Sequence, residues 1–240
     1  MPRIVFINKM DKLGADFYTS LDSILERLSK NAIAVQLPIG ADSTFSGLID
    51  IVQEKAFKFE GAKGENIIEI PIPGDMLEKV KEYRAKMMEK VAEASDEMMN
   101  KYLSGETFSI DEVKAGIRGL VIKSQIFPVL CGSALANIGV QLMLDAVVDY
   151  LPAPTDVPAI NGINPDTEAE ETRLPDDKQP FCALAFKIAT DPFVGKLIFF
   201  RVYSGVVTAG SYVYNSSTGG KERLGRIVRL HANQREDVQE

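Results

Sequence analysis

The chain opens with an uninterrupted apolar run, Ile4-Val5-Phe6-Ile7. A run without alternation is typical of a strand that is covered on both faces, as in a parallel sheet. In the following stretch, "DFYTSLDSILERLSK", apolar residues recur at steps of three and four, and Asp16 stands where a helix N-cap is expected. Residues 1–31 therefore predict one strand and one helix of an α/β sheet.

The pattern changes at about Ala32 to short runs of β-branched and aromatic residues separated by Gly, Pro, Asp and Ser: "AIAVQLPIG", "GLIDIV", "KAFKFEG" and "NIIEIPIP". Such runs predict antiparallel strands joined in hairpins. A long helical pattern follows, with apolar positions at Met76, Val80, Tyr83, Met87, Val91, Ala94, Met98 and Tyr102. This stripe predicts a helix packed on the preceding sheet; a groove for a partner protein is the alternative.

The α/β pattern then resumes. Ser109 and Glu112 have the spacing of a capping box, which predicts a helix that runs to about Lys123. "IFPVLCGSAL" is a second fully apolar strand, and an amphipathic helix is expected from Asn137 to Leu151. Residues 32–108 are therefore predicted to be an α+β insertion between two parts of one α/β domain, 1–31 and 109–151.

The last third of the chain has a different character. Residues 152–180 are acidic and rich in proline, which predicts an extended connection between domains. From residue 181 to 240 the chain shows successive strand patterns, "FCALAFKIA", "KLIFFRVYSG", "SYVYN" and "ERLGRIVRLH", with a turn expected at Asp191-Pro192. The predicted fold class is thus multidomain α/β plus β, with a parallel sheet, an α+β insertion and the start of a β-barrel.

Composition narrows the choice of function. The formal net charge of −7 disfavours a protein that coats DNA, because that binding uses a surplus of Lys and Arg. No apolar run approaches the roughly 20 residues that span a bilayer, and the two cysteines lie in apolar runs, so a cytoplasmic protein without a membrane partner is expected. With His231 as the single histidine, neither a transition-metal site nor a histidine-based catalytic triad is expected.

The first candidate site is Asn8-Lys9-Met10-Asp11, at the end of the first strand, where open α/β sheets bind ligands. The Asp11 carboxylate could accept two hydrogen bonds from the ring N–H and the exocyclic amine of guanine, a pair that adenine does not offer. Asn8 could tie the loop to its neighbours and reach the purine, and the alkyl stem of Lys9 could lie along the base. Met10 is interpreted as a spacer.

The second candidate loop is Ser133-Ala134-Leu135, which follows the second buried strand. A short loop of small residues can present backbone N–H groups to an oxygen of a base. A plain turn from strand to helix is the alternative. Because both loops are expected at the same edge of one sheet, a guanine site is the favoured interpretation.

Together, "INKMDKLGADF", "PVLCGSAL", "GVQLMLDAVVDYLPAP" and "ALAFKIATDPFVGKLIFFRVYSG" resemble bacterial-type elongation factor G, the GTPase of ribosomal translocation. The resemblance covers nearly all of the chain. It implies an incomplete P-loop-GTPase-type domain with an insertion, followed by an incomplete β-barrel. It also implies that Asn8, Lys9 and Asp11 form the guanine-specificity motif and that Ser133, Ala134 and Leu135 form the second base-contacting loop. GTP or GDP is the implied cofactor of the parent protein, and the ribosome, through its RNA and stalk protein, the implied partner.

One departure from the family pattern limits the expected activity. The sequence contains no G-x-x-x-x-G-K-[ST] loop, so it lacks the phosphate-binding lysine and the magnesium-binding hydroxyl, and no catalytic or metal-ligating residue is assigned. We therefore expect an internal piece of a longer GTPase that by itself neither hydrolyses GTP nor binds it usefully. A release-factor recycling GTPase, a tetracycline-resistance ribosome-protection protein and a module that only binds the ribosome or its stalk protein remain alternatives.

Overall fold

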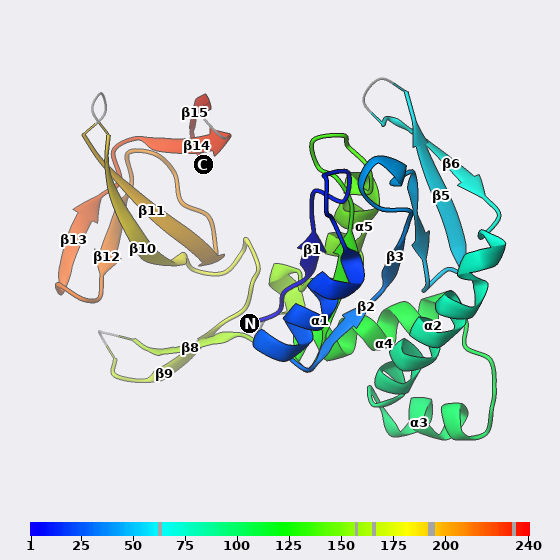
Figure 1. Cartoon of the computed structure of the whole chain (residues 1–240). Helices are drawn as coiled ribbons and strands as arrows, with labels where there is room; N and C mark the ends of the chain where they lie inside the picture. The colour runs from blue at the N-terminus through cyan, green and yellow to red at the C-terminus, as the bar shows by residue number, and fades with distance from the viewer. Residues whose placement is uncertain (62–63, 157, 165–166, 192–194, 232–233) are drawn as a thin grey trace. The chain divides into compact units, whose positions relative to one another are not determined.

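The computed structural model describes residues 1–61, 64–156, 158–164, 167–191, 195–231 and 234–240. The chain divides into two compact units, Met1–Pro152 and Ala153–Glu240. The first unit mixes helices and strands, and the second contains strands and one short 3-10 turn (Figure 1). The predicted division into an α/β part and a β part is confirmed.

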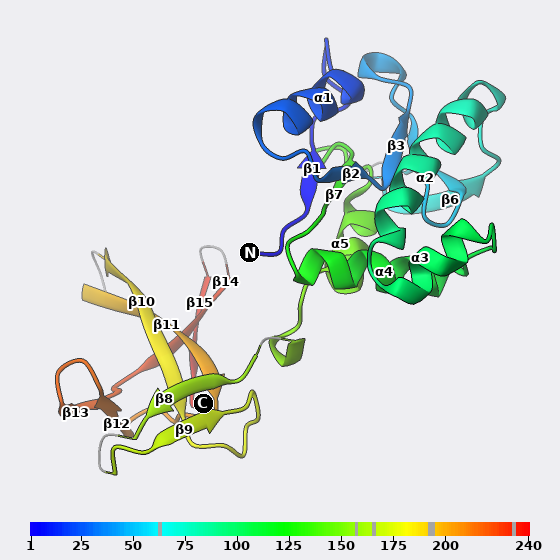
Figure 2. The same cartoon turned by 90° about the horizontal axis from the view of Figure 1, so that it is seen from below.

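Three parallel strands form the first sheet, in the order β1-β7-β2: β1 (Val5–Ile7), β7 (Phe127–Cys131) and β2 (Ala32–Ala34). Three helices cover it: α1 (Phe17–Arg27) on one face, and α4 (Ile110–Ile122) and α5 (Val140–Tyr150) on the other (Figures 1 and 2). The central strand β7 is almost wholly buried and the edge strand β2 is fully buried, whereas the other edge strand, β1, is half-buried.

A second, antiparallel sheet follows in the order β3-β4-β5-β6: β3 (Gln36–Ile39), β4 (Gly47–Asp50), β5 (Lys55–Glu60) and β6 (Asn66–Ile70). These strands are antiparallel, as predicted. The prediction was wrong for Ala32–Ala34, which pairs parallel with β7 and belongs to the first sheet. Val35 joins the two sheets, since its N–H donates to Val129 O at 3.0 Å and its carbonyl accepts from Ile51 N at 3.1 Å.

The helical stripe is two helices, α2 (Leu77–Ala92) and α3 (Asp96–Leu103), where one long helix was predicted. Ser95 ends the continuity: its backbone is extended, at φ −158° and ψ 160°, and its hydroxyl accepts from Met98 N at 3.2 Å as an N-cap. The predicted packing on the sheet is confirmed for α2, whose buried side chains belong to the core that the strands also form: Val80, Met87, Met88 and Val91.

Two helix starts show how well caps can be predicted. The hydroxyl of Ser109 accepts from Glu112 N and the Glu112 carboxylate accepts from Ser109 N, which confirms the capping box at the start of α4. Asp16 likewise caps α1 through Thr19 N. By contrast, α5 begins at Val140 and not at Asn137, because Gly139 precedes it at φ 81°, in the left-handed region.

The second unit is built from β-hairpins (Figure 1). Its strands pair antiparallel as β8 (Ile160–Ile163) with β9 (Glu170–Arg173), β10 (Cys182–Asp191) with β11 (Gly195–Ser204), β12 (Tyr212–Asn215) with β13 (Gly220–Arg223), and β14 (Ile227–His231) with β15 (Gln234–Val238). The connection predicted over 152–180 thus contains a hairpin, and "ERLGRIVRLH" is divided between β13 and β14, with Gly225 outside both. Pro192 of the predicted turn lies outside the described residues.

The hydrophobic core lies entirely in the first unit as far as the described residues show. It includes Cys131, whereas Cys182 in the second unit is half-buried, and both thiols are free. Within the described ranges, no helix has the length and apolar character needed to cross a membrane.

Candidate functional site

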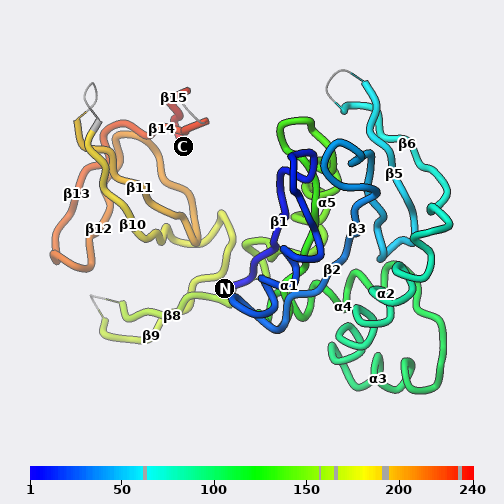
Figure 3. The backbone as a smooth tube through the Cα atoms, in the orientation of Figure 1, coloured from blue at the N-terminus to red at the C-terminus, as the bar shows by residue number. Residues whose placement is uncertain are grey.

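The two predicted loops meet at the end of the parallel sheet. Two backbone hydrogen bonds join them: Gly132 N donates to Ile7 O at 3.0 Å, and Met10 N donates to Gly132 O at 3.1 Å. Figure 3 shows the loop after β1, in blue, and the loop before α5, in green, at the same end of the sheet. Parallel pairing of β1 with β7 imposes this arrangement, because both carboxyl ends then lie at one edge.

Asn8 bridges the loops with one atom. Its Oδ1 accepts from Ala134 N at 2.9 Å and from the neighbouring Lys9 N at 2.7 Å. These two residues, Asn8 and Ala134, are 126 positions apart in the sequence. The predicted tie between the loop and its neighbours is therefore present. Contact between Asn8 and a purine stays a prediction.

Asp11 is an ionised carboxylate with one oxygen already paired. The Ser133 hydroxyl, and after it Lys12, holds the pKa of Asp11 below its usual range. Oδ2 lies 2.9 Å from Lys12 Nζ, and Oδ1 is sealed from solvent without a well-oriented hydrogen bond among the described residues. Guanine could bind both oxygens only after Lys12 turns away from Oδ2 and the atoms that bury Oδ1 move. The first change costs little, because surface ion pairs are weak.

The amides of the second loop are less available than the sequence suggests. Ser133 N donates to Ile138 O at 2.9 Å, and Ala134 N is occupied by Asn8. In the described part of the chain, only Leu135 of the three has no acceptor for its amide, and its side chain is 87% exposed. Ser133 is buried; its hydroxyl accepts from Ala136 N at 3.4 Å and helps to lower the pKa of Asp11. That this loop presents backbone N–H groups to a base stays a prediction, and in this conformation the Leu135 amide is the one of the three left open.

Two residues of the first loop differ in role. Lys9 is exposed, with φ 64°, so its alkyl stem is free to lie against a ligand. Met10 is 1% exposed and belongs to the hydrophobic core, and its carbonyl accepts from Asp42 N at 2.9 Å. The interpretation of Met10 as a spacer was wrong: it anchors the loop.

Gly132 and Gly139 support the site, and the sequence reasoning missed both. A Cβ at Gly132 would lie 2.3 Å from Ile138 O, and a Cβ at Gly139 would lie 2.8 Å from Cys131 O. Neither position can hold a side chain without moving the second loop. Their place after an apolar strand and before a helix was the available signal.

The geometry suits the recognition of a planar group that offers hydrogen-bond donors. A carboxylate, an exposed lysine stem and one open amide surround the edge of the sheet. No metal site accompanies them: among the described residues, no three His, Cys, Asp or Glu side chains are placed to hold an ion.

Comparison with known proteins gives two family matches. The family described as elongation factor Tu GTP binding domain matches residues 1–153, and elongation factor Tu domain 2 matches residues 195–240. A crystal structure of a protein from Thermus thermophilus is similar over all of this chain, with a TM-score of 0.77 and 24% sequence identity, which shows a shared fold. This chain spans 32% of that protein's length.

Proposed function

Because the chain belongs to the family of translational GTPases with an elongation factor Tu GTP binding domain, we propose that it serves ribosomal translocation as a factor of the elongation factor G type. The observation that supports this best is the bridge from Ala134 N to Asn8 Oδ1, which joins the two loops across the long segment between them. In this proposal Asp11 selects guanine, Lys9 covers the base and the loop Ser133-Ala134-Leu135 completes the pocket. The proposed location is the cytoplasm.

The 240 residues are not expected to hold GTP or GDP firmly by themselves. The sequence lacks the phosphate-binding loop, and association costs an estimated 4 to 15 kcal/mol, while each charge-assisted hydrogen bond contributes roughly 1.5 to 3 kcal/mol. Calorimetry with GDP tests this directly. Heat that fits a dissociation constant of about 10 μM or tighter would overturn the proposal of an inactive chain.

Selectivity for guanine can still be measured on weak binding. In saturation-transfer NMR at millimolar nucleotide, the difference signal of GDP is expected to be stronger than that of ADP. Asp11→Asn is expected to remove this difference between the two nucleotides. Asp22→Asn, an exposed carboxylate on α1, is the matched control. Equal signals for the two nucleotides in the unchanged chain would contradict the assignment of these loops to guanine.

Binding to the ribosome or its stalk protein is the second candidate function. It is favoured by apolar side chains that the insertion leaves exposed: Leu77, Tyr102 and Leu103. The basic residues of the second unit are a weaker indication, since Arg226 is already paired with Asp237 at 2.7 Å; they are Arg201, Lys221, Arg223, Arg226 and Arg229. Co-sedimentation with ribosomes at low salt is expected, and its absence would count against this role. A release-factor recycling or ribosome-protection factor would behave alike in this assay.

A further inference from the structure

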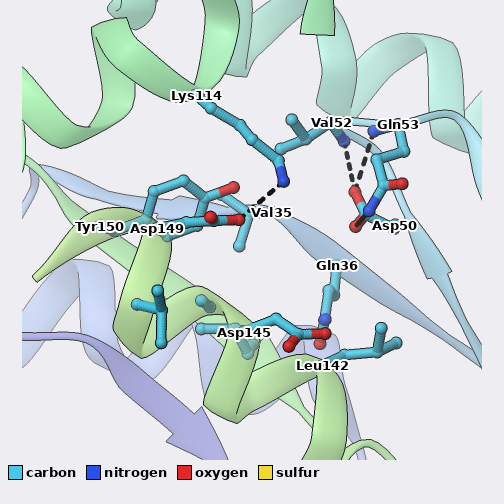
Figure 4. Close-up of a pocket in the computed structure, with 13 residues that line it drawn as sticks. Val35, Gln36, Asp50, Val52, Gln53, Lys114, Leu142, Asp145, Asp149 and Tyr150 are labelled. Carbon is cyan, nitrogen blue, oxygen red and sulfur yellow. Dashed lines mark hydrogen bonds and ion pairs between the residues drawn. The ribbon is translucent and has the colours of Figure 1, made fainter. Parts of the chain in front are cut away.

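The first unit contains a cavity that is separate from the proposed guanine site. It has a volume of about 300 Å³, at the lower end of the range for ligand pockets. Its walls come from β3, β4, α4 and α5. Figure 4 shows Lys114, Asp149 and Asp50 in the upper part of the view, and Gln36, Asp145 and Leu142 in the lower part.

Two buried polar side chains that line this cavity each carry a donor without a partner; the other polar atom of Gln36, Oε1, accepts from Cys131 N at 3.5 Å. Gln36 is 3% exposed and Tyr150 is 4% exposed. Among the described residues, the Gln36 carboxamide nitrogen and the Tyr150 hydroxyl have no hydrogen-bond partner. Neither atom is sealed from solvent. Both atoms therefore reach open space. Each is a donor that an oxygen atom in the cavity could satisfy.

The charges around the cavity are mainly negative. Lys114 Nζ pairs with Asp149 at 2.7 Å, and the Asp50 carboxylate accepts from Val52 N, Gln53 N and Gln53 Nε2. Asp145 stands at the rim with no ion pair or hydrogen bond within the described part of the chain. One lysine against three carboxylates leaves an excess of negative charge, which favours a cation.

The kind of cation follows from the rest of the lining. The described carboxylates do not form a metal-type cluster, while the walls include apolar side chains of Val35, Val52, Leu130, Leu142 and Ala146. A ligand that suits both features has a short apolar body and an ammonium group.

We propose that this cavity binds a small primary amine with an oxygen atom at its far end, of the amino alcohol class. The ammonium pairs with Asp145, and the oxygen accepts from the Tyr150 hydroxyl or the Gln36 carboxamide. The apolar body lies against Leu142 and the valines. This site does not depend on the proposed role in translation.

A matched series of ligands tests the proposal on the full chain by NMR. 4-Amino-1-butanol is expected to bind with a dissociation constant of about 1 mM or below, and to shift the side-chain amide signals of Gln36. 1,4-Butanediol, which lacks the charge, and 4-hydroxybutyrate, which carries the opposite charge, are each expected to bind at least about tenfold more weakly. Equal affinity for the three, or no binding of the amine at about 10 mM, would overturn the proposal.

Two variants locate the ligand. Asp145→Asn is expected to weaken the binding of 4-amino-1-butanol about tenfold. Glu89 is an exposed carboxylate on α2, and Glu89→Gln should leave this affinity unchanged. Tyr150→Phe keeps the ring and removes the hydroxyl. It should weaken the binding of the amino alcohol by several-fold. The affinity for butylamine, which has no oxygen, should not change. If Asp145→Asn and Glu89→Gln behave alike, the ammonium is not held where we place it.

Discussion

The two units handle their apolar side chains in opposite ways. In the first, strands of both sheets contribute side chains with almost no exposure, among them Leu37, Leu48 and Ile49 at 0%. In the second, the paired strands β10 and β11 leave Leu184, Phe186, Ile188 and Ile198 more than half exposed. The same strand propensity thus gives a core in one unit and hairpins held mainly by backbone hydrogen bonds in the other.

The difference matters for the site. Both loops of the proposed guanine site belong to the unit with the core, and Met10 is itself a core residue. Their geometry is therefore supported by packing, which resists displacement more strongly than single hydrogen bonds do. The second unit has no comparable support within its described residues, so its strands are expected to open at lower cost.

The largest expected effect compares one isoleucine in each unit. Ile117 in α4 is fully buried, so Ile117→Ala should cost about 2 to 5 kcal/mol of unfolding free energy. Ile188 in β10 is 68% exposed, and Ile188→Ala should change stability by less than about 0.5 kcal/mol. Urea unfolding followed by circular dichroism measures both. Similar costs for the two substitutions would mean that Ile188 is covered in solution.

A smaller contrast uses two glycines that have no positive φ. Gly132→Ala would place a Cβ 2.3 Å from Ile138 O and should cost about 1 to 3 kcal/mol. It should also shift the amide resonance of Ala134, because the bond to Asn8 must move. Gly162 in β8 has open space around it, so Gly162→Ala should be neutral or stabilise by up to about 1 kcal/mol. An unchanged Ala134 resonance in Gly132→Ala would show that the loop is not held as described.

Removing a helix cap should have a smaller effect still. Ser109→Ala loses the hydroxyl that accepts from Glu112 N and should cost about 1 kcal/mol, seen as a lower urea midpoint for the first unit. Hydrogen exchange in the β10–β11 hairpin should not change, because α4 and that hairpin belong to different units. If exchange in both units accelerates equally, they unfold together and the contrast between them fails.

Local chemistry explains which parts of this structure could be predicted. The caps at Asp16 and Ser109 and the antiparallel strands depend on nearby residues, and they were predicted correctly. The break at Ser95 was missed because Ala94 and Met98 keep the same spacing through two short helices as through one long one. The parallel pairing of Ala32–Ala34 was missed because it depends on β7, a partner far along the chain.

In the candidate site too, the features set by nearby residues were predicted and those set by tertiary packing were not. Its residues were found because a motif at a strand end is a local signal, and the meeting of the two loops followed from parallel pairing. Which amide stays open could not be predicted, because it depends on the position of Asn8 Oδ1 relative to Ala134 N, a distance that tertiary packing sets. Met10 appeared to be a spacer because a single methionine in a loop has no periodicity to mark it as core.

The smallest expected effect is a pH dependence in each unit. Lys101 and the backbone of Ser109 lower the pKa of Glu112 from 4.5 to about 2. Since the folded pKa lies below the unfolded one, the carboxylate stabilises the fold at pH above about 4.5, and this contribution is lost as the pH falls toward 2. Glu112→Gln should therefore be less stable than the unchanged chain at about pH 7, and the difference should shrink steadily between about pH 4.5 and pH 3.

In the second unit, Asn164 and then Arg173 lower the pKa of Glu171, so the sign is the same. Glu171→Gln should accelerate hydrogen exchange in the β8–β9 hairpin near about pH 7 and have a smaller effect below about pH 4. It should leave the urea midpoint of the first unit unchanged at every pH, whereas Glu112→Gln lowers it. A stability difference for Glu112→Gln that persists undiminished to about pH 3 would show that lost packing, and not the charge on the cap, explains the effect.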